Sequence, residues 1–121
     1  MIINIKALGL DLTQAINAYL QDKLAYVEKS LGVYANETQA QVEVGKTTRH
    51  HKSGDIFRAE INLFYRGKKM RAEVENPDLY LSIDGMKDKI IQDVYKFEKK
   101  QNSLFRRGGR TIKSFLRGWR R

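Results

Sequence analysis

The chain has 121 residues and a formal net charge of +9, from 23 Lys and Arg against 14 Asp and Glu. This length suffices for one domain with one hydrophobic core, and the absence of Cys excludes disulfides and thiolate metal ligands. No run approaches the roughly 18 apolar residues that a membrane span needs, and the first residues lack the pattern of a secretory signal. We therefore expect a cytoplasmic protein with a single domain.

The positive charge is concentrated at the C-terminal end. Residues 1–103 contain 16 basic and 14 acidic side chains, whereas residues 104–121 contain seven basic and no acidic ones. Large apolar residues are interleaved with these cations, namely Phe105, Phe115, Leu116 and Trp119. We predict a folded domain over 1–103 and a basic-aromatic tail over 104–121 that binds a polyanion, either RNA, DNA or an anionic membrane.

The first third of the chain predicts a strand followed by a helix. Ile3, Ile5 and Ala7 alternate with polar residues, as in a short strand. Apolar residues then recur every three or four positions from Leu12 to Leu31, which predicts an amphipathic helix of about five turns. Asp11 is a weak candidate for the N-cap of this helix, and Gly32 ends it.

Three segments with alternating apolar residues follow and predict three strands. The first contains Ala40, Val42 and Val44, and a polar loop over residues 45–55 comes after it. The other two are separated by the two-residue loop Arg66-Gly67. The register that this loop sets pairs apolar side chains on one face and polar ones on the other: Leu63 with Met70, Ile61 with Ala72, Ala59 with Val74, and Arg58 with Glu75.

A second helix is predicted after the breaker Asn76-Pro77-Asp78, with Pro77 at or near its first position. An apolar stripe runs along it to about Gln101 and comprises Ile83, Met86, Ile90, Val94 and Phe97. The element order β-α-β-β-β-α predicts an α+β fold with two helices packed on one face of a four-stranded sheet. The crossover through the first helix would be right-handed if the first two strands pair in parallel.

Motifs for catalysis or metal binding are weak. Gly45-Lys46-Thr47 is similar to the end of a phosphate-binding loop, but the position of its required earlier glycine is Ala40, and no helix follows. His50 and His51 are the only histidines and lack further ligands for zinc. Hydrogen bonding to phosphate and plain exposure to solvent both remain open for this basic loop.

Paired carboxylates do not predict an active site either. Glu73 and Glu75 lie on the solvated face of a predicted strand, where nothing raises a pKa. Asp84 and Asp88 are one turn apart on the second helix, where they pair with Lys87 or cap the helix. We predict a protein that is not an enzyme and that has no metal, cofactor or small-molecule substrate.

Lysines on the second helix form a stripe that suits a phosphate backbone. At 100° per residue the stripe comprises Lys89, Lys96 and Lys100, with Lys99 beside it. Asp93 interrupts it, so a solvated face with an ion pair between Lys89 and Asp93 is the alternative. Lys23 and Lys29 of the first helix would extend the stripe into a shared basic surface if the helices lie side by side.

The tail has a helical pattern of its own beyond Gly108-Gly109. Its apolar residues have the spacing of one helix face: Ile112, Phe115, Leu116 and Trp119. Such a short basic helix is marginal in isolation, and its aromatic stripe could stack on bases, enter a protein groove or lie in a membrane interface. A peripheral membrane or partner-docking adaptor and a module for double-stranded RNA are therefore the alternatives to the function considered next.

Several short runs give the chain a specific resemblance. They are Arg71-Ala72-Glu73, the run from Asp78 to Asp84 (DLYLSID), Asp88-Lys89, and in the first helix Leu12-Thr13-Gln14-Ala15 and Lys23-Leu24. Over about residues 1–101 the chain resembles the ribosome hibernation promoting factor family, also called ribosome-associated translation inhibitors. The predicted β-α-β-β-β-α order is also the fold of that family.

The resemblance implies a protein without enzymatic activity that binds the small ribosomal subunit and its 16S rRNA. It would lie in the decoding channel and inhibit translation by blocking the mRNA and tRNA sites, with a monomer favoured and membrane binding not expected. By position, the family's basic contacts to RNA correspond to Lys23, Arg71, Lys89, Lys96, Lys99 and Lys100. Arg106, Arg107 and Arg110 of the basic tail complete the candidate RNA-binding set.

Two features depart from the family pattern. The family usually has an Arg-Gln pair where this chain has Gln92 and Asp93, which removes one cation and adds one anion. The chain also ends at Arg121, without the additional C-terminal domain of long members, and its basic tail differs from the acidic tail of some short members. We therefore expect a short form, for which the sequence leaves open whether it promotes or prevents ribosome dimerisation.

Overall fold

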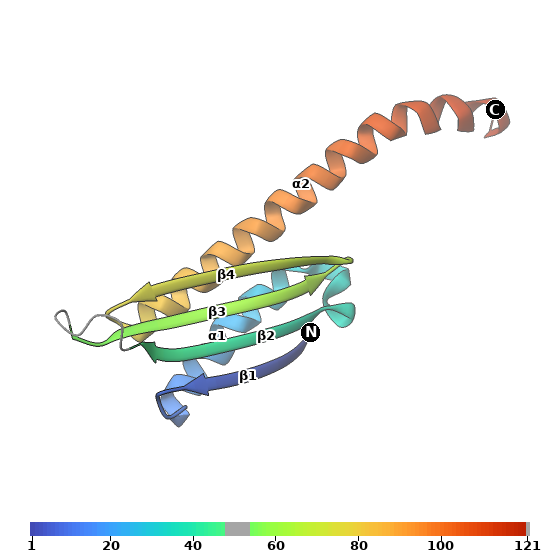
Figure 1. The fold of residues 1–121 in the computed structure, drawn as a ribbon. Coiled ribbons are helices and arrows are strands. Elements are labelled where there is room, and N and C mark those ends of the chain that lie inside the picture. Colours follow the sequence, from blue (N-terminus) through green and yellow to red (C-terminus); the bar gives the residue numbers. More distant parts are fainter. Residues whose placement is uncertain (48–53, 121) are drawn as a thin grey trace.

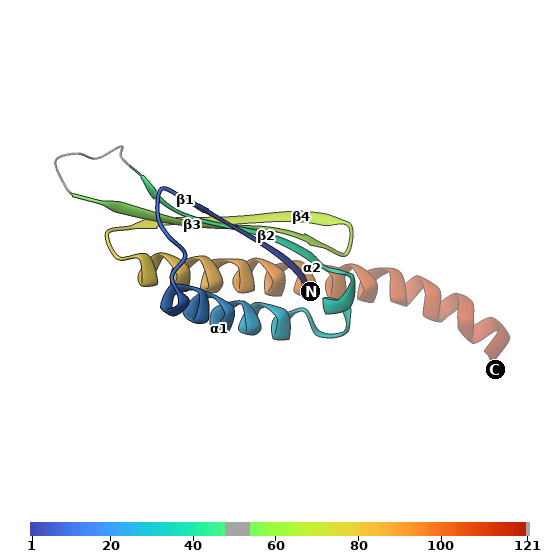
Figure 2. The same ribbon diagram turned by 90° about the horizontal axis from the view of Figure 1, so that it is seen from below.

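A four-stranded sheet with two helices on one face forms the body of the protein (Figures 1 and 2). The computed structural model describes residues 1–47 and 54–120, with side chains up to residue 104. In chain order the elements are β1 (Ile2–Leu8), α1 (Gln14–Ser30), the 3-10 helix η1 (Gly32–Glu37), β2 (Gln39–Thr47), β3 (Ile56–Tyr65), β4 (Lys68–Asn76) and α2 (Leu79–Arg120). The predicted α+β fold and its element order are confirmed.

The strands are arranged in the order β1-β2-β3-β4. β1 and β2 pair in parallel across the α1 crossover, and the other two pairs are antiparallel. The predicted β3–β4 register is confirmed: Leu63 pairs with Met70, Ile61 with Ala72, Ala59 with Val74, and Arg58 with Glu75. Arg66 and Gly67 both have positive φ, 50° and 77°, as the tight two-residue hairpin loop requires.

The core lies between the sheet and the two helices, which Figure 2 shows side by side beneath it. The apolar stripes of both helices are buried against the inner face of the sheet. The fully buried helix residues include Leu20, Leu24, Val27, Ile83, Met86, Ile90 and Val94. Since these residues recur at helical spacing, burying one face of each helix fixes which residues stay on the surface.

The helix starts differ in detail from the sequence prediction. Thr13, not Asp11, caps α1, because its side-chain oxygen accepts a hydrogen bond from the backbone N–H of Ile16 at 3.2 Å. At the start of α2, Asp78 accepts a hydrogen bond from the backbone N–H of Tyr80 at 2.9 Å. Pro77 therefore lies before the first turn of α2 and not within it.

β2 is longer than predicted. Gly45, Lys46 and Thr47 belong to β2 and pair with the first residues of β3, instead of starting a loop. The hairpin extends this far because β3 already begins at Ile56. A strand at Gly45-Lys46-Thr47 also agrees with the rejection of a phosphate-binding loop there. The two histidines, at positions 50 and 51, lie outside the described residues.

α2 also continues beyond its predicted end near Gln101 and runs to Arg120 (Figure 1). The expected break at Gly108-Gly109 is absent. Each glycine disfavours a helix by roughly 1 kcal/mol relative to alanine, but it keeps its backbone N–H and does not end a helix by itself. The segment predicted as a separate short helix extends an existing one, so it needs no new nucleation.

Candidate RNA-binding surface

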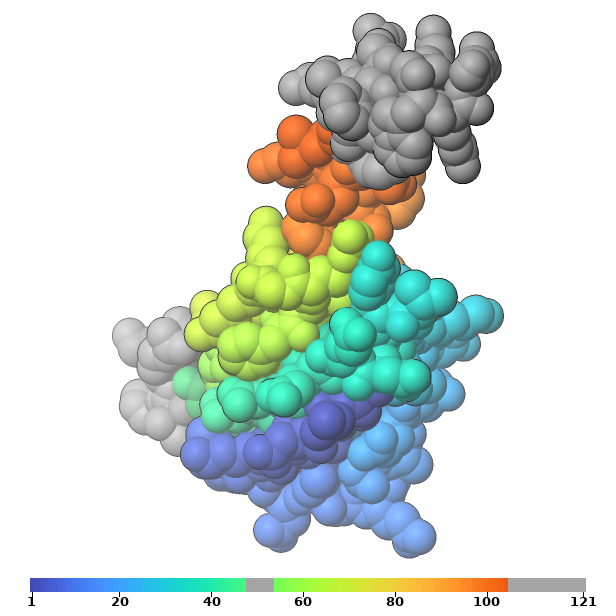
Figure 3. Space-filling model, turned by 90° about the vertical axis from the view of Figure 1, so that its right-hand side faces the viewer, coloured from blue at the N-terminus to red at the C-terminus, as the bar shows by residue number. Residues whose placement is uncertain are grey.

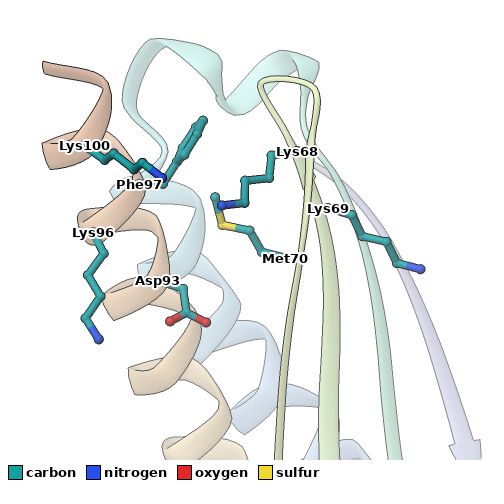
Figure 4. Close-up of a pocket in the computed structure, with 7 residues that line it drawn as sticks. All are labelled: Lys68, Lys69, Met70, Asp93, Lys96, Phe97 and Lys100. Atoms are coloured by element: carbon teal, nitrogen blue, oxygen red, sulfur yellow. The ribbon is translucent and has the colours of Figure 1, made fainter. Parts of the chain in front are cut away.

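Lysines from α2 and from the β3–β4 hairpin meet at the edge of the sheet. They line an open pocket of about 280 Å³ between β4 and α2, whose walls comprise Lys68, Lys69, Met70, Asp93, Lys96, Phe97 and Lys100 (Figure 4). Lys68 points from β4 towards α2, whereas Lys69 points away from α2. The pocket is therefore a seam with cations on both of its walls.

Lys87, near the start of α2, forms an ion pair with Asp88 at 2.6 Å, but four lysines further along the helix have no such described partner. Among the side chains of residues 1–47 and 54–104, no carboxylate forms an ion pair with Lys89, Lys96, Lys99 or Lys100. The alternative of an ion pair between Lys89 and Asp93 is therefore not realised. Seven residues bring a helix back to nearly the same side, so Lys89 extends the flank on which Lys96 lies.

A cluster around Glu98 fixes α2 against the β3–β4 hairpin. Nη1 of Arg66 donates to the two carboxylate oxygens of Glu98 at 2.9 and 3.0 Å, and the hydroxyl of Tyr65 donates to the same carboxylate. Burial, together with that hydrogen bond, raises the pKa of Tyr65 to about 12. The hydrogen bond from Tyr65 also holds the pKa of Glu98 below its usual 4.5. The cluster thus holds the α2 lysines next to Lys68.

Lys23 lies at the contact between α1 and α2. Its Nζ is 3.7 Å from Oδ1 of Asp84 and 4.9 Å from the centroid of the Tyr19 ring. The Tyr19 hydroxyl donates to Asp84 at 2.6 Å, and this hydrogen bond raises the pKa of Tyr19 to about 12. The structure therefore does not bring Lys23 together with Lys96 and Lys100. The basic seam is shared with β4 instead of α1.

Arg71 lies on the open face of the sheet, away from both helices. Its Nε donates to Glu60 at 2.6 Å, and its Nη2 donates to Glu73 at 2.8 Å. Arg58 belongs to the same cluster, with hydrogen bonds of 2.6 Å to Glu43 and 2.7 Å to Glu73. The hydrogen bond from Arg58 holds the pKa of Glu73 below its usual value. Arg71 is thus engaged in a network of its own.

The remaining candidates lie along α2. Lys99 lies beside Tyr95 and Glu98, on a side of α2 that the seam does not include. Arg106, Arg107 and Arg110 lie outside the residues whose side chains the structure describes. Lys68 was missing from the candidates, although it shares the parity of Met70, Ala72 and Val74 and so faces the helices.

The family is shown by a comparison with known protein families. The model described as "Sigma 54 modulation protein / S30EA ribosomal protein" matches residues 3–102. The chain belongs to this family. S30EA membership confirms the family expected from the sequence, and it agrees with the prediction that the protein is not an enzyme.

Relatives in the S30EA family include long and short proteins. The chain is 30% identical over 104 residues to the ribosome hibernation promoting factor of Pseudomonas putida, with 86% of this chain and 93% of that protein covered. It is 28% identical over 88 residues to the ribosome hibernation promotion factor of Picosynechococcus sp.. There the match covers 73% of this chain but only 44% of the relative, so the chain spans less than half of that protein.

Solved structures support the same fold. The N-terminal domain of Protein Y from Thermus thermophilus is similar with a TM-score of 0.64 and 30% identity, covering 80% of this chain and 99% of that one. A ribosomal subunit interface protein from Coxiella burnetii has a TM-score of 0.65 at 16% identity, covering 82% of this chain and 99% of that one, and shows the fold alone. No helix in the described part of the chain is long and apolar enough to cross a membrane.

Proposed function

We propose that this protein is a cytoplasmic ribosome hibernation factor that binds the small ribosomal subunit and its 16S rRNA. It lies in the decoding channel and inhibits translation because it occupies the space of mRNA and tRNA. The observation that carries this proposal is the row formed by Lys89, Lys96 and Lys100 on α2 of the S30EA fold, which pair with no carboxylate among the side chains that the structure describes. Relatives named as ribosome hibernation promoting factors, such as that of Pseudomonas putida, support it.

The mechanism needs only charge and bulk. Lys89, Lys96 and Lys100 follow one side of α2 at intervals of about 10 and 6 Å along the helix axis, from a rise of 1.5 Å per residue. Ammonium groups at such intervals neutralise backbone phosphates and position the protein without reading base sequence. The two-layer body then excludes other ligands from the channel sterically, so no chemical step is required.

Salt dependence tests the electrostatic part of this mechanism. If about six phosphates are neutralised, log K for small subunits should fall with log[salt] with a slope of about −4 to −5. Co-sedimentation of the full chain with purified small subunits at a series of salt concentrations measures this slope. Binding that does not depend on salt would contradict the mechanism.

A triple lysine variant tests the surface itself. Lys89→Ala, Lys96→Ala and Lys100→Ala together should weaken binding and lower the salt slope, while the circular dichroism of the domain stays unchanged. A matched control changes three lysines elsewhere, with Lys6→Ala, Lys29→Ala and Lys46→Ala. If both triple variants bind alike, net charge and not the α2 surface determines affinity.

Competition tests the location. Small subunits loaded with mRNA and tRNA should bind the protein more weakly than empty ones, since the ligands share one channel. Equal binding to loaded and empty subunits would place the site elsewhere. Capture by anionic vesicles without ribosome binding would favour the membrane adaptor, and competition by generic duplex RNA would favour the double-stranded RNA module.

A further inference from the structure

The seam between β4 and α2 contains more positive charge than the helix alone predicts. Four lysines line it together with Asp93, which gives a formal charge of four minus one, or +3. The ammonium group of Lys69 points away from α2, so Lys68, Lys96 and Lys100 are the three whose charge concerns the seam. Figure 3 views this end of the molecule, where the atoms of the β3–β4 hairpin lie against those of α2. The pocket is open to solvent, so a large anion can reach it.

We propose that Lys68 is a further phosphate-binding residue and that it forms a clamp with Lys96 and Lys100 around the backbone of a ribosomal RNA strand. This inference rests on the proposed function and specifies where the strand crosses the protein. One side of the clamp is the hairpin and the other is α2, so the strand runs along the edge of the sheet. The open face of the sheet, with Arg71, is left outside the contact.

The position of Lys68 is fixed before any ligand arrives. Strand parity directs it towards the helices, and its Nζ lies 5.3 Å from the centroid of the Phe97 ring. That cation–π contact orients the ammonium group without neutralising its charge. The bonds between Arg66 and Glu98 hold the hairpin and α2 together. A clamp whose walls are already held in place loses little conformational entropy on binding.

The surroundings favour an anion as the ligand. Among the described side chains, no carboxylate pairs with Lys68, Lys96 or Lys100. The floor of the seam contains Met70, which is buried, and Phe97, which is partly buried. These two side chains are apolar and so bring no anion that would compete with a phosphate for the ammonium groups.

Asp93 acts against the binding of an anion. It lines the same pocket (Figure 4). Lys68 offsets that anion from the opposite wall. Asp93→Asn should therefore tighten binding, because it removes a negative charge without removing side-chain volume.

The test compares two neighbouring lysines of one strand. Lys68→Met keeps most of the apolar stem and removes the charge from the seam. Lys69→Met makes the same change on the other face, where the Lys69 Nζ is 5.8 Å from the centroid of the Phe64 ring. Affinity of the full chain for small ribosomal subunits is measured for each variant over a range of salt concentrations, and circular dichroism checks the fold.

Loss of one phosphate contact should make the slope of log K against log[salt] shallower by about 0.7 to 0.9 for Lys68→Met. If the variant and the unmodified chain bind equally well at 1 M salt, this difference in slope makes the variant bind about five- to eightfold more weakly at 0.1 M salt. Lys69→Met should stay within about twofold of the unmodified chain, and Lys68→Arg should retain both slope and affinity.

The outcomes separate this inference from the proposed function. Equal slopes for Lys68→Met and Lys69→Met would overturn the clamp while leaving ribosome binding intact. Weaker binding by Asp93→Asn would overturn it as well. If the unmodified chain does not bind small subunits at all, the proposed function fails first, and the clamp fails with it.

Discussion

Gly85 lies where α2 approaches β4, and a side chain has little room there. A Cβ at this position would lie 3.1 and 3.2 Å from Cγ1 and Cγ2 of Val74, below the roughly 3.5–4.0 Å optimum for carbon contacts. Val74 is β-branched and stiff at χ1, so it cannot turn both methyl groups away. Gly85→Ala therefore combines overpacking of about 1–3 kcal/mol with a helix-propensity gain of about 1 kcal/mol. We expect a net loss of about 1 kcal/mol in the free energy of unfolding.

A double-mutant cycle tests this reasoning. Val74→Ala removes both methyl groups and leaves its Cβ, which is 3.5 Å from the new atom at position 85. In that background Gly85→Ala should stabilise by about 1 kcal/mol, so the coupling energy is about 2 kcal/mol. Urea unfolding followed by circular dichroism measures all four proteins. If Gly85→Ala is equally destabilising in both backgrounds, the contact with Val74 is not the cause.

Three further predictions concern the caps and the titrating groups. In urea unfolding, Thr13→Ala should lower the free energy of unfolding by about 1 kcal/mol, because the backbone N–H of Ile16 loses its acceptor. No change would mean that Thr13 does not cap α1. The pKa of Glu98 is lower in the folded protein than in the unfolded chain. Its contribution to the free energy of unfolding is therefore complete above about pH 4.5 and is lost as the pH falls through the folded pKa. Glu98→Gln should flatten the acid side of the stability profile, and an unchanged profile would contradict this account. The pKa values of Tyr19 and Tyr65 are raised to about 12. Phenolate absorbance of the folded protein should therefore show two of its six tyrosines titrating near pH 12. Titration of all six near pH 10 would exclude both hydrogen bonds.

The fold was predictable where one periodicity continued over a whole element. The β3–β4 register followed from a two-residue loop and from alternation on both strands, because a slip of one residue would expose the core face. The N-cap at Thr13 and η1 were not predictable, since a cap depends on local backbone geometry and six residues are too few for a period. The continuation of α2 past Gln101 was missed because the apolar stripe that predicted the helix ends near that residue, and the tail beyond Gly108-Gly109 was interpreted as a separate short helix.

The candidate site was predicted in part. Helical periodicity placed Lys89, Lys96 and Lys100 on one side of α2, but it could not show which neighbour that side meets. Tertiary packing decides which neighbour it meets. Lys96 and Lys100 meet β4, whereas Lys23 of α1 contacts α2 at Asp84. Lys68 could have been found from strand parity, but one lysine next to a turn carries no periodic signal.

The uninterrupted course of α2 has a mechanical consequence. Its 42 residues correspond to a rod of about 63 Å, and its first turns lie in the hydrophobic core. A force on the distal end is transmitted to the core as a torque, whereas a flexible linker would absorb it. A partner that binds the C-terminal end of α2 therefore also restricts how the folded body can rotate in its binding cavity. The orientations of the two ends are coupled.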